Sequence, residues 1–463
     1  MKKFLTAIMM LFLAGLVCIL VYLALYHDSL GLQWNNPFTS LLQGTSAFSA
    51  PQESGGSTKQ EVVSETEENG NNGASISKAV APASKFYPLF HQTEGLDCLT
   101  DSASRTLYQG MLKTVYAIAP DADKDGYYPA DTATVKKEKL SEKQIRAAVL
   151  AFRSDNPQLF WVVNRYSYTY DGKDTAVRLY GYLPPAQCNA LIKKMNASVS
   201  SIVGGIPAGL SELDREINLF QAIAKMCTYD AAAVTDLKRW ASHAANGALV
   251  DGTAVCEGYA RAMQLLSAYC GLDCRTVNGE GNGAAHMWNV IRIDGLWYHL
   301  DPTWGDGEPL NYEYFNVTDS IIRTDHSISG NILLVKGEKI KDEDGVSADY
   351  NLPLLACNSM KANYFRVKGI PVSGFNSANN KKAADAIAAA AKSKSPAVEF
   401  YIDASLNYDE TVAQMVGAPR YQLLTYIRAA NKAAVAGHKI NEDKIQYVLA
   451  KKSRGMTVIL NYQ

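Results

Sequence analysis

The pattern of apolar and polar positions predicts alternating helices and strands from residue 86 onward. Near the start of this part, Ser141 is a typical N-cap for an amphipathic helix that must stop before Pro157. Two β-rich runs around a glycine-containing turn then predict a hairpin, and two helical stretches follow it. These elements are predicted over residues 141–156, 159–170, 175–183, 187–203 and 212–227. We place a domain boundary near residue 205, so that residues 86–205 form a first α+β domain.

The strongest helical pattern covers residues 256–270, within a second predicted domain of residues 206–335. An apolar stripe follows one side of this helix, and polar residues follow the other side. The stripe consists of Tyr259, Met263, Leu266 and Cys270, and the polar side consists of Glu257, Arg261 and Gln264. Gly271 ends the helix as a C′ residue would. Cys256 therefore lies in the first turn, on the side of the apolar stripe.

After this helix, the dipeptide Asp294-Gly295 stands between two β-rich runs and predicts a tight hairpin. The register that follows pairs Ile293 with Leu296, Val290 with His299 and Trp288 with Asp301. His286 then lies one diagonal step from Asp301 on the same face of the sheet, within reach of its side chain. The hairpin therefore predicts a histidine that is oriented by a carboxylate.

Residues 346–463 alternate again and predict a small α/β or α+β domain in which we identify only packing residues. Three strands are predicted over residues 364–372, 397–404 and 455–462, and two helices over residues 379–393 and 421–436.

The amino terminus has a different pattern. Residues 4–26 contain no charged side chain, and these 23 residues exceed the roughly 20 that cross a bilayer. Lys2 and Lys3 favour an amino end in the cytoplasm, so we expect residues 1–27 to be an uncleaved transmembrane anchor. A cleaved signal peptide is the alternative, and in both cases the rest of the chain is exported. Residues 28–85 are expected to be a disordered tether, because their composition cannot bury a core.

Composition narrows the classes of partner and cofactor. The chain has 45 basic and 46 acidic residues and a net charge of -1, which gives no basic field for a nucleic acid. Its 8 cysteines are too sparse for a disulfide framework and include no C-x-x-C pair for structural zinc. Cys270 and Cys274 are expected to be buried thiols. Residues 121–126 imitate a calcium loop, but Thr132 stands where that loop needs a glutamate, so we expect an acidic turn.

Cys256 has two interpretations. A lone buried cysteine normally packs as a small apolar side chain. At a helix start, however, free backbone N–H groups and the positive end of the macrodipole favour the nucleophilic thiolate and can hold an oxyanion. His286 and Asp301 supply a base and the group that orients it. We therefore predict a catalytic triad of Cys256, His286 and Asp301.

Several neighbours of the predicted triad receive structural interpretations. We expect His299 to be packed or hydrogen-bonded within the sheet, and Asn289 to be structural on its opposite face. Asp306 belongs to a turn-rich loop. Trp288 and Trp304 either wall a cleft from which water is excluded or pack in the core.

Three blocks of the sequence resemble the transglutaminase-like superfamily, in particular its bacterial exported members. They are Val255–Ala260 around the cysteine, His286 with Trp288-Asn289, and Asp301 with Thr303-Trp304. The resemblance implies an α+β fold with a papain-like core, in which a helix that carries cysteine packs on an antiparallel sheet that carries histidine and aspartate. It also implies a second oxyanion donor upstream of the cysteine, for which Ser242, His243 and Asn246 stay open.

We expect a membrane-anchored extracellular thiol enzyme that acts on peptide or protein amide bonds through a thioester. Water as acceptor makes it a cysteine peptidase or amidase, which the resemblance favours. An amine acceptor makes it a protein-glutamine transglutaminase, and a non-catalytic surface-binding module is the third alternative. We expect no cofactor or metal, and as partners the membrane and a peptide or protein substrate, which includes cell-envelope substrates. Substrate identity and oligomeric state stay open.

Overall fold

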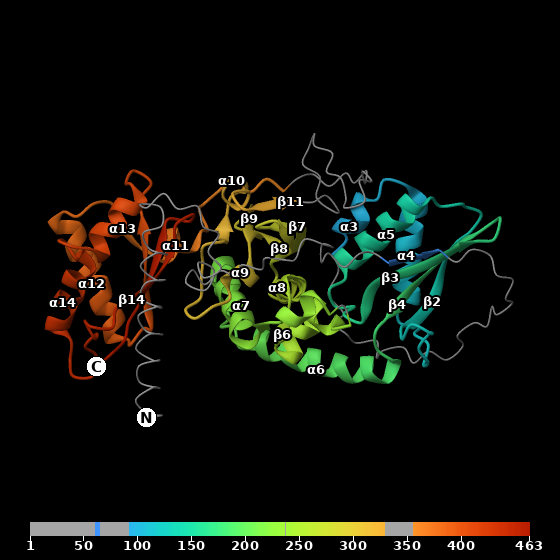
Figure 1. The fold of residues 1–463 in the computed structure, drawn as a ribbon, viewed down its shortest axis with the longest axis horizontal. Coiled ribbons are helices and arrows are strands. Elements are labelled where there is room, and N and C mark those ends of the chain that lie inside the picture. The colour runs from blue at the N-terminus through green and yellow to red at the C-terminus, as the bar shows by residue number, and fades with distance from the viewer. Residues whose placement is uncertain (1–60, 65–91, 237, 329–354) are drawn as a thin grey trace, which may run out of the picture. The chain divides into compact units, whose positions relative to one another are not determined.

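The computed structural model describes residues 61–64, 92–236, 238–328 and 355–463 (Figure 1). The expected transmembrane anchor, residues 1–27, lies outside these ranges, as does most of the expected tether, residues 28–85. Among the helices that the structure describes, none is both long and apolar enough to cross a membrane.

The first region is a four-stranded sheet with helices packed beside it. Its sheet order is β1-β3-β4-β2. The elements are β1 (Glu61–Ser64), α3 (Glu94–Cys98), α4 (Ser102–Thr114), β2 (Tyr128–Val135), α5 (Glu142–Asp155), β3 (Val162–Tyr170), β4 (Thr175–Gly181) and α6 (Pro185–Gly204). The hairpin β3–β4 confirms the predicted pair of strands. Ser141 caps α5 through a capping box with Gln144, as its position predicts.

Strand β1 falls inside the segment that we expected to be a tether. It pairs in parallel with β3. These four residues therefore form an edge strand of the sheet. The composition of residues 28–85 does not predict this strand, because its backbone hydrogen-bond partner, β3, lies about 100 residues later in the chain.

The second region is an antiparallel five-stranded sheet with the order β10-β9-β8-β7-β11. Its strands are β7 (Asp273–Gly281), β8 (Ala284–Ile293), β9 (Leu296–Leu300), β10 (Phe315–Val317) and β11 (His326–Ile328). Its helices are α7 (Glu212–Met226), α8 (Cys256–Tyr269), α9 (Pro302–Gly305) and α10 (Asp319–Ile322). Between α7 and α8 lie β5 (Thr228–Tyr229), η2 (Ala231–Val234), η3 (Trp240–His243), η4 (Gly247–Asp251) and β6 (Thr253–Ala254), with β5 and β6 paired in parallel.

The hairpin β8–β9 has the register that the Asp294-Gly295 dipeptide predicts. Ile293 pairs with Leu296, and the ladder continues in step toward the site. Asp294 and Gly295 have φ values of 49° and 80°, the left-handed backbone that a two-residue type I′ turn requires. Strand β9 ends at Leu300, so Asp301 follows the strand directly.

Helix α8 packs against β7 and β8, and both of its sides are buried. The Asn289 side-chain amide donates to the Ala260 carbonyl at 2.9 Å, which ties the helix to β8. On the polar side, Arg153 of α5 lies 3.3 Å from the Glu257 carboxylate. Arg261 donates to the Arg153 carbonyl at 2.9 Å. The first region therefore covers the polar side of α8 with paired charges, a contact that the sequence pattern does not predict.

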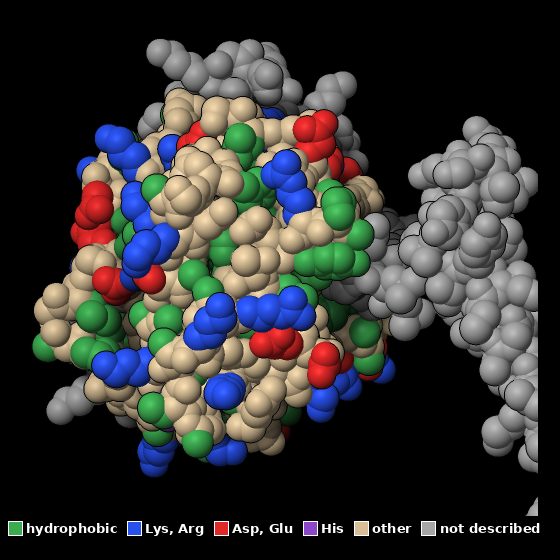
Figure 2. Space-filling model, turned by 90° about the vertical axis from the view of Figure 1, so that its left-hand side faces the viewer, with side chains coloured by type: hydrophobic (Ala, Val, Ile, Leu, Met, Phe, Trp, Pro, Cys, Tyr) green, Lys and Arg blue, Asp and Glu red, His purple; other side chains and the backbone are tan. Residues whose placement is uncertain are grey.

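The third region is a four-stranded sheet, β12-β13-β15-β14, with a hydrophobic core of its own. Its elements are α11 (Tyr364–Lys368), β12 (Ile370–Val372), α12 (Ser377–Lys392), β13 (Ala397–Ile402), α13 (Tyr408–Val416), α14 (Gln422–Ala433), β14 (Gln446–Ala450) and β15 (Gly455–Ile459). Figure 2 shows the side of the molecule that carries these elements, where basic, acidic and apolar side chains are interspersed.

Residues 364–372 do not form the single strand that we predicted. The Asn363 side chain accepts a hydrogen bond from the Arg366 backbone N–H and starts helix α11, so β12 begins only at Ile370. Helix α11 also carries Tyr364 and Phe365, which join a hydrophobic cluster that runs through all three regions. Because this cluster joins residues on both sides of the predicted domain boundaries, it does not separate the domains, and the boundaries at residues 205 and 335–346 stay predictions.

Gly258 in α8 provides a test of this packing. A Cβ at this position would lie 2.6 Å from the Ser242 carbonyl oxygen and 2.7 Å from the Ala254 Cβ. We expect Gly258→Ala to push the first turn of α8 outward and to lower the free energy of unfolding by about 1–3 kcal/mol, measured by urea unfolding. Gly204 at the end of α6 has open space around such a Cβ, so Gly204→Ala is the control and should leave stability equal or higher. Equal losses in both variants would contradict the packing argument.

Candidate active site

Cys256 is the first residue of α8 and is half-buried, whereas the six other cysteines in the described ranges are buried. All seven are free thiols, and Cys270 and Cys274 are the buried helix-end and strand-start thiols that we expected. Val255 precedes the helix as its N-cap, and its N–H donates to the Ser242 carbonyl at 3.0 Å. The first amides of a helix lack an intrahelical acceptor, so the Cys256 sulfur lies beside backbone donors at the positive end of the dipole.

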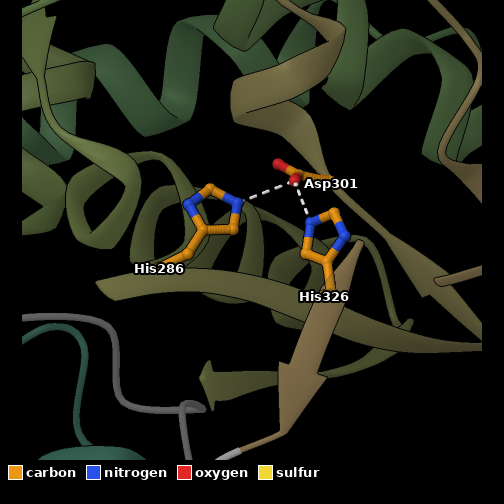
Figure 3. Close-up of side chains that lie close together, drawn as sticks. All are labelled: His286, Asp301 and His326. Carbon is orange, nitrogen blue, oxygen red and sulfur yellow. Dashed lines mark hydrogen bonds and ion pairs between the residues drawn. The ribbon is translucent and has the colours of Figure 1, made fainter. Parts of the chain in front are cut away.

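His286 and Asp301 meet at the end of the hairpin β8–β9 (Figure 3). Nε2 of His286 and Oδ2 of Asp301 are 2.8 Å apart. The other carboxylate oxygen, Oδ1, accepts hydrogen bonds from the backbone N–H groups of Thr303 at 2.9 Å and Trp304 at 3.1 Å, because Asp301 is the N-cap of α9. This cap turns the carboxylate so that Oδ2 faces the histidine. The structure thus brings together the two side chains that the hairpin register places on one face.

The electrostatics of the site favour a charged pair. Burial lowers the pKa of His286, but the charge of Asp301 and hydrogen bonds with Asp301 and the Cys256 thiol raise it to about 10. Burial acts to raise the pKa of Asp301, and the neighbouring His286 holds it well below its usual range. An imidazolium that faces a carboxylate on one side and a thiol on the other is the arrangement that activates a cysteine nucleophile.

A second histidine, His326, also contacts Asp301, and the sequence analysis did not identify it. Its Nε2 lies 3.3 Å from Oδ2 of Asp301, and its ring is fully buried. His326 comes from β11, which pairs with β7 opposite Gly281. This strand of three residues is too short for a recognisable β pattern, so the sequence carries no signal that predicts the contact between His326 and Asp301.

Aromatic rings surround the imidazole of His286. Trp288 stacks on it with ring centroids 5.9 Å apart, and the centroid of Trp304 is 5.4 Å away. Gly281 leaves room for this arrangement, because a Cβ there would lie 2.9 Å from Trp304 and 3.2 Å from His286. The two tryptophans thus form apolar walls beside the proposed base, which strengthens charge–charge interactions between the groups they enclose.

His299 is a packed and hydrogen-bonded histidine, as we expected. Its Nδ1 accepts a hydrogen bond from the Trp288 indole at 3.0 Å, and its Nε2 lies 2.9 Å from the Asp319 carboxylate. Because Nδ1 is an acceptor, Nε2 carries the proton and the ring is neutral. Burial lowers the pKa of His299 and reinforces this state.

The three upstream side chains that we considered as oxyanion donors are each hydrogen-bonded to another residue. Ser242 bonds to Asp230 at 2.6 Å, Asn246 to Asp251 at 3.2 Å and His243 to Ala233 at 3.3 Å. Tyr229, which the sequence analysis did not identify, interacts with the site instead. Burial raises its pKa, and the charges of Cys256 and Asp301 raise it further. The parallel pairing of Tyr229 with Ala254, two residues before Cys256, places it there.

Two clusters in the described ranges offer three metal-ligand atoms each, within 4.8 Å of one another: His286, Asp301 and His326, and His299, Asp319 and Cys357. In both clusters the histidines are hydrogen-bonded directly to the carboxylate. The acidic turn at residues 121–126 pairs with a cation of the protein, since Asp125 lies 2.7 Å from Arg165. Asp306 does more than shape its turn, because it accepts a hydrogen bond from the Tyr259 hydroxyl at 2.5 Å.

Comparisons with known proteins point to one superfamily. Residues 201–302 match the model of the transglutaminase-like superfamily. The kyphoscoliosis peptidase of Mus musculus is 26% identical over 141 residues, which cover 25% of this chain and 21% of that protein. The kyphoscoliosis peptidase of Homo sapiens is 28% identical over 109 residues, which cover 21% and 16%. The chain therefore aligns with only about a fifth of the length of these relatives.

One solved structure, described as that of a TGase, is 14% identical and covers 37% of this chain and 50% of that chain. Its TM-score with this chain is 0.23.

The raised pKa of His286 predicts a pH dependence of stability. Because this pKa is about 10 in the folded chain and 6.5 is its ordinary value, pairing with Asp301 stabilises the fold fully below about pH 6.5. This contribution is lost as the pH rises through about 10. We therefore expect the difference in unfolding free energy between wild type and His286→Gln to be largest near pH 6 and to shrink toward pH 10, measured by urea unfolding. A difference that does not change with pH would contradict the ion pair.

Proposed function

We propose that this chain, in which residues 201–302 form a domain of the transglutaminase-like superfamily, is a thiol enzyme that cleaves amide bonds in peptides or proteins. The observation that carries the proposal is the buried hydrogen bond between His286 and Asp301 at 2.8 Å, together with Cys256 as the other side chain that raises the pKa of His286. The partial similarity to peptidases favours water as the acceptor.

In the proposed reaction, the thiol proton of Cys256 has already passed to His286, and the resulting thiolate attacks the substrate carbonyl carbon beside the imidazolium. The backbone N–H groups at the start of α8 stabilise the oxyanion that develops. His286 then donates its proton to the leaving amine, and a thioester with Cys256 remains. Water then attacks this thioester with the neutral His286 as general base, which releases the acid and restores the thiolate of Cys256 beside the imidazolium of His286. Asp301 keeps the ring of His286 oriented and stabilises its charged form in both halves of the reaction.

The proposed place of action is the outer side of a membrane, with residues 1–27 as the anchor. Its support is the uncharged run of residues 4–26 behind two lysines. In this proposal the part of the tether that precedes β1 (Glu61–Ser64) lets the folded regions reach peptide or protein substrates, including those of the cell envelope.

Replacing the nucleophile tests the proposal directly. We expect Cys256→Ala to lower cleavage of a proteome-derived peptide library by at least about 1,000-fold, because no other group in the proposed mechanism replaces the thiol. Cys270→Ala, at the other end of the same helix, is the control and should keep the product profile of the wild type. Identical profiles from Cys256→Ala and wild type, read by mass spectrometry, would refute the enzyme.

An amine-acceptor assay separates hydrolysis from cross-linking. The chain is incubated with a glutamine-rich protein and a biotin-labelled primary amine, with Cys256→Ala as the blank. We expect new peptide ends and no biotin incorporation, because water is the proposed acceptor. Biotin incorporation without new peptide ends would contradict the proposed peptidase activity and support a protein-glutamine transglutaminase instead.

A further inference from the structure

We propose that His326 is a positioning residue that holds Asp301 toward His286, and that Lys452 of the third region positions His326 through Asp325. This inference rests on the proposed function of Cys256, His286 and Asp301.

The first step is the hydrogen bonding of Asp301, whose side chain is fully buried. A carboxylate offers about four acceptor positions. Two on Oδ1 are occupied by the backbone N–H groups that Asp301 caps, and one on Oδ2 is occupied by His286. His326 fills the remaining position on Oδ2 (Figure 3). Without His326, Oδ2 would keep an unsatisfied lone pair between apolar rings, and the carboxylate would lose the contact that opposes its rotation.

The second step is the position of the His326 ring. Its Nδ1 lies 2.7 Å from Oδ1 of Asp325, on the side opposite Asp301. Its Nε2 faces Asp301 on the other side, so the ring lies between the two carboxylates. The rings of Trp304 and Trp288 pack against it with centroids 4.3 Å and 4.9 Å away. Both the hydrogen bonds and the packing therefore leave His326 one orientation.

The third step leads to the turn between β14 and β15. Asp325 accepts hydrogen bonds from the hydroxyl of Tyr314 and from Nζ of Lys452. The same ammonium donates to the Tyr314 hydroxyl at 2.6 Å. The backbone N–H of Lys452 donates to the Glu313 carboxylate at 2.8 Å, so the turn is held at two points. Lys452 lies 151 positions after Asp301 in the sequence, yet only Asp325 and His326 separate the two side chains.

Charged and titratable side chains surround His326 on several elements. Asp301 and His286 face it from the hairpin β8–β9, Asp325 is its neighbour in the chain, and Lys452 lies behind Asp325. His299, across Trp288, is neutral. Each carboxylate thus has a cationic partner, which is the condition under which buried charges persist.

The test compares four variants of the full chain: His326→Leu, His326→Gln, Lys452→Met and Lys451→Met. The glutamine can still donate from its amide to Asp301, whereas leucine cannot. Lys451 is exposed and pairs with Asp409 at the surface, so Lys451→Met is the matched control for Lys452→Met. Each variant is measured for kcat and KM on a peptide that the wild type cleaves, for the rate of Cys256 alkylation by iodoacetamide, and for its melting temperature.

We expect His326→Leu to lower both kcat and the alkylation rate by about 10–100-fold, the usual cost of losing a partner that orients a reactive side chain, with KM nearly unchanged. His326→Gln should recover most of this loss, and Lys452→Met should lie between the two. Lys451→Met should match the wild type. Recovery by glutamine and a loss confined to kcat are effects that a merely structural role would not produce.

A folded His326→Leu variant with wild-type alkylation would overturn the inference, as would a His326→Gln variant that is as slow as His326→Leu. If His326→Leu does not fold, the other two variants decide. Wild-type rates in Lys452→Met overturn the role of Lys452, and low kcat and alkylation rates in a folded His326→Gln overturn the role of His326. Alkylation needs no substrate. A wild type that cleaves no peptide, with an alkylation rate that falls in His326→Leu and recovers in His326→Gln, would therefore contradict the proposed peptidase activity and still support the positioning role of His326.

Discussion

The hydrogen bond between His286 and Asp301 depends on three separate parts of the fold. The Asp294-Gly295 turn sets the register that places both residues on one face. The first backbone N–H groups of the short helix α9 donate to Oδ1 of Asp301 and turn the carboxylate, and β11 brings His326 to Oδ2, the oxygen that faces His286. Because the site is buried among tryptophans, each charge needs a partner, and the loss of one partner would leave the others unpaired. The geometry of the base is therefore a property of the whole sheet rather than of one hairpin.

The same requirement explains why the flanking regions touch the central one through charges. Glu257 follows the proposed nucleophile and is buried. Burial acts to raise its pKa, but Arg261, His243 and Arg153 hold this pKa well below the usual range. On the other side of the site, Lys452 meets Asp325. Each flanking region thus supplies a cation to a carboxylate that directly neighbours a proposed catalytic or positioning residue in the chain. Arg153 pairs with the buried Glu257, and Lys452 pairs with the partly buried Asp325. This arrangement couples the placement of the flanking regions to the site itself.

The parts of the fold that could be predicted are those with a strong local signal. The capping box at Ser141 and the hairpin register both follow from residues within a few positions of one another. The prediction of one strand over residues 364–372 was wrong, because the N-cap at Asn363 starts a helix within the β-rich pattern. The oxyanion candidates show the same limit. The side chains of Ser242 and Asn246 bond to Asp230 and Asp251, and His243 pairs with Glu257 rather than with the proposed triad. Tyr229, in contrast, interacts with the site because β5 pairs with β6.

The sequence by itself determined that a cysteine begins a helix and that a histidine and an aspartate share a face of one hairpin, because helical period, cap and turn are encoded by neighbours in the chain. Only the tertiary structure decided what surrounds them. The burial of the polar side of α8, the second histidine on Asp301 and the reach of Lys452 all join segments far apart in the sequence. Such contacts form because buried charges and unpaired acceptors must find partners wherever the fold brings them, and no local pattern records which partner that is.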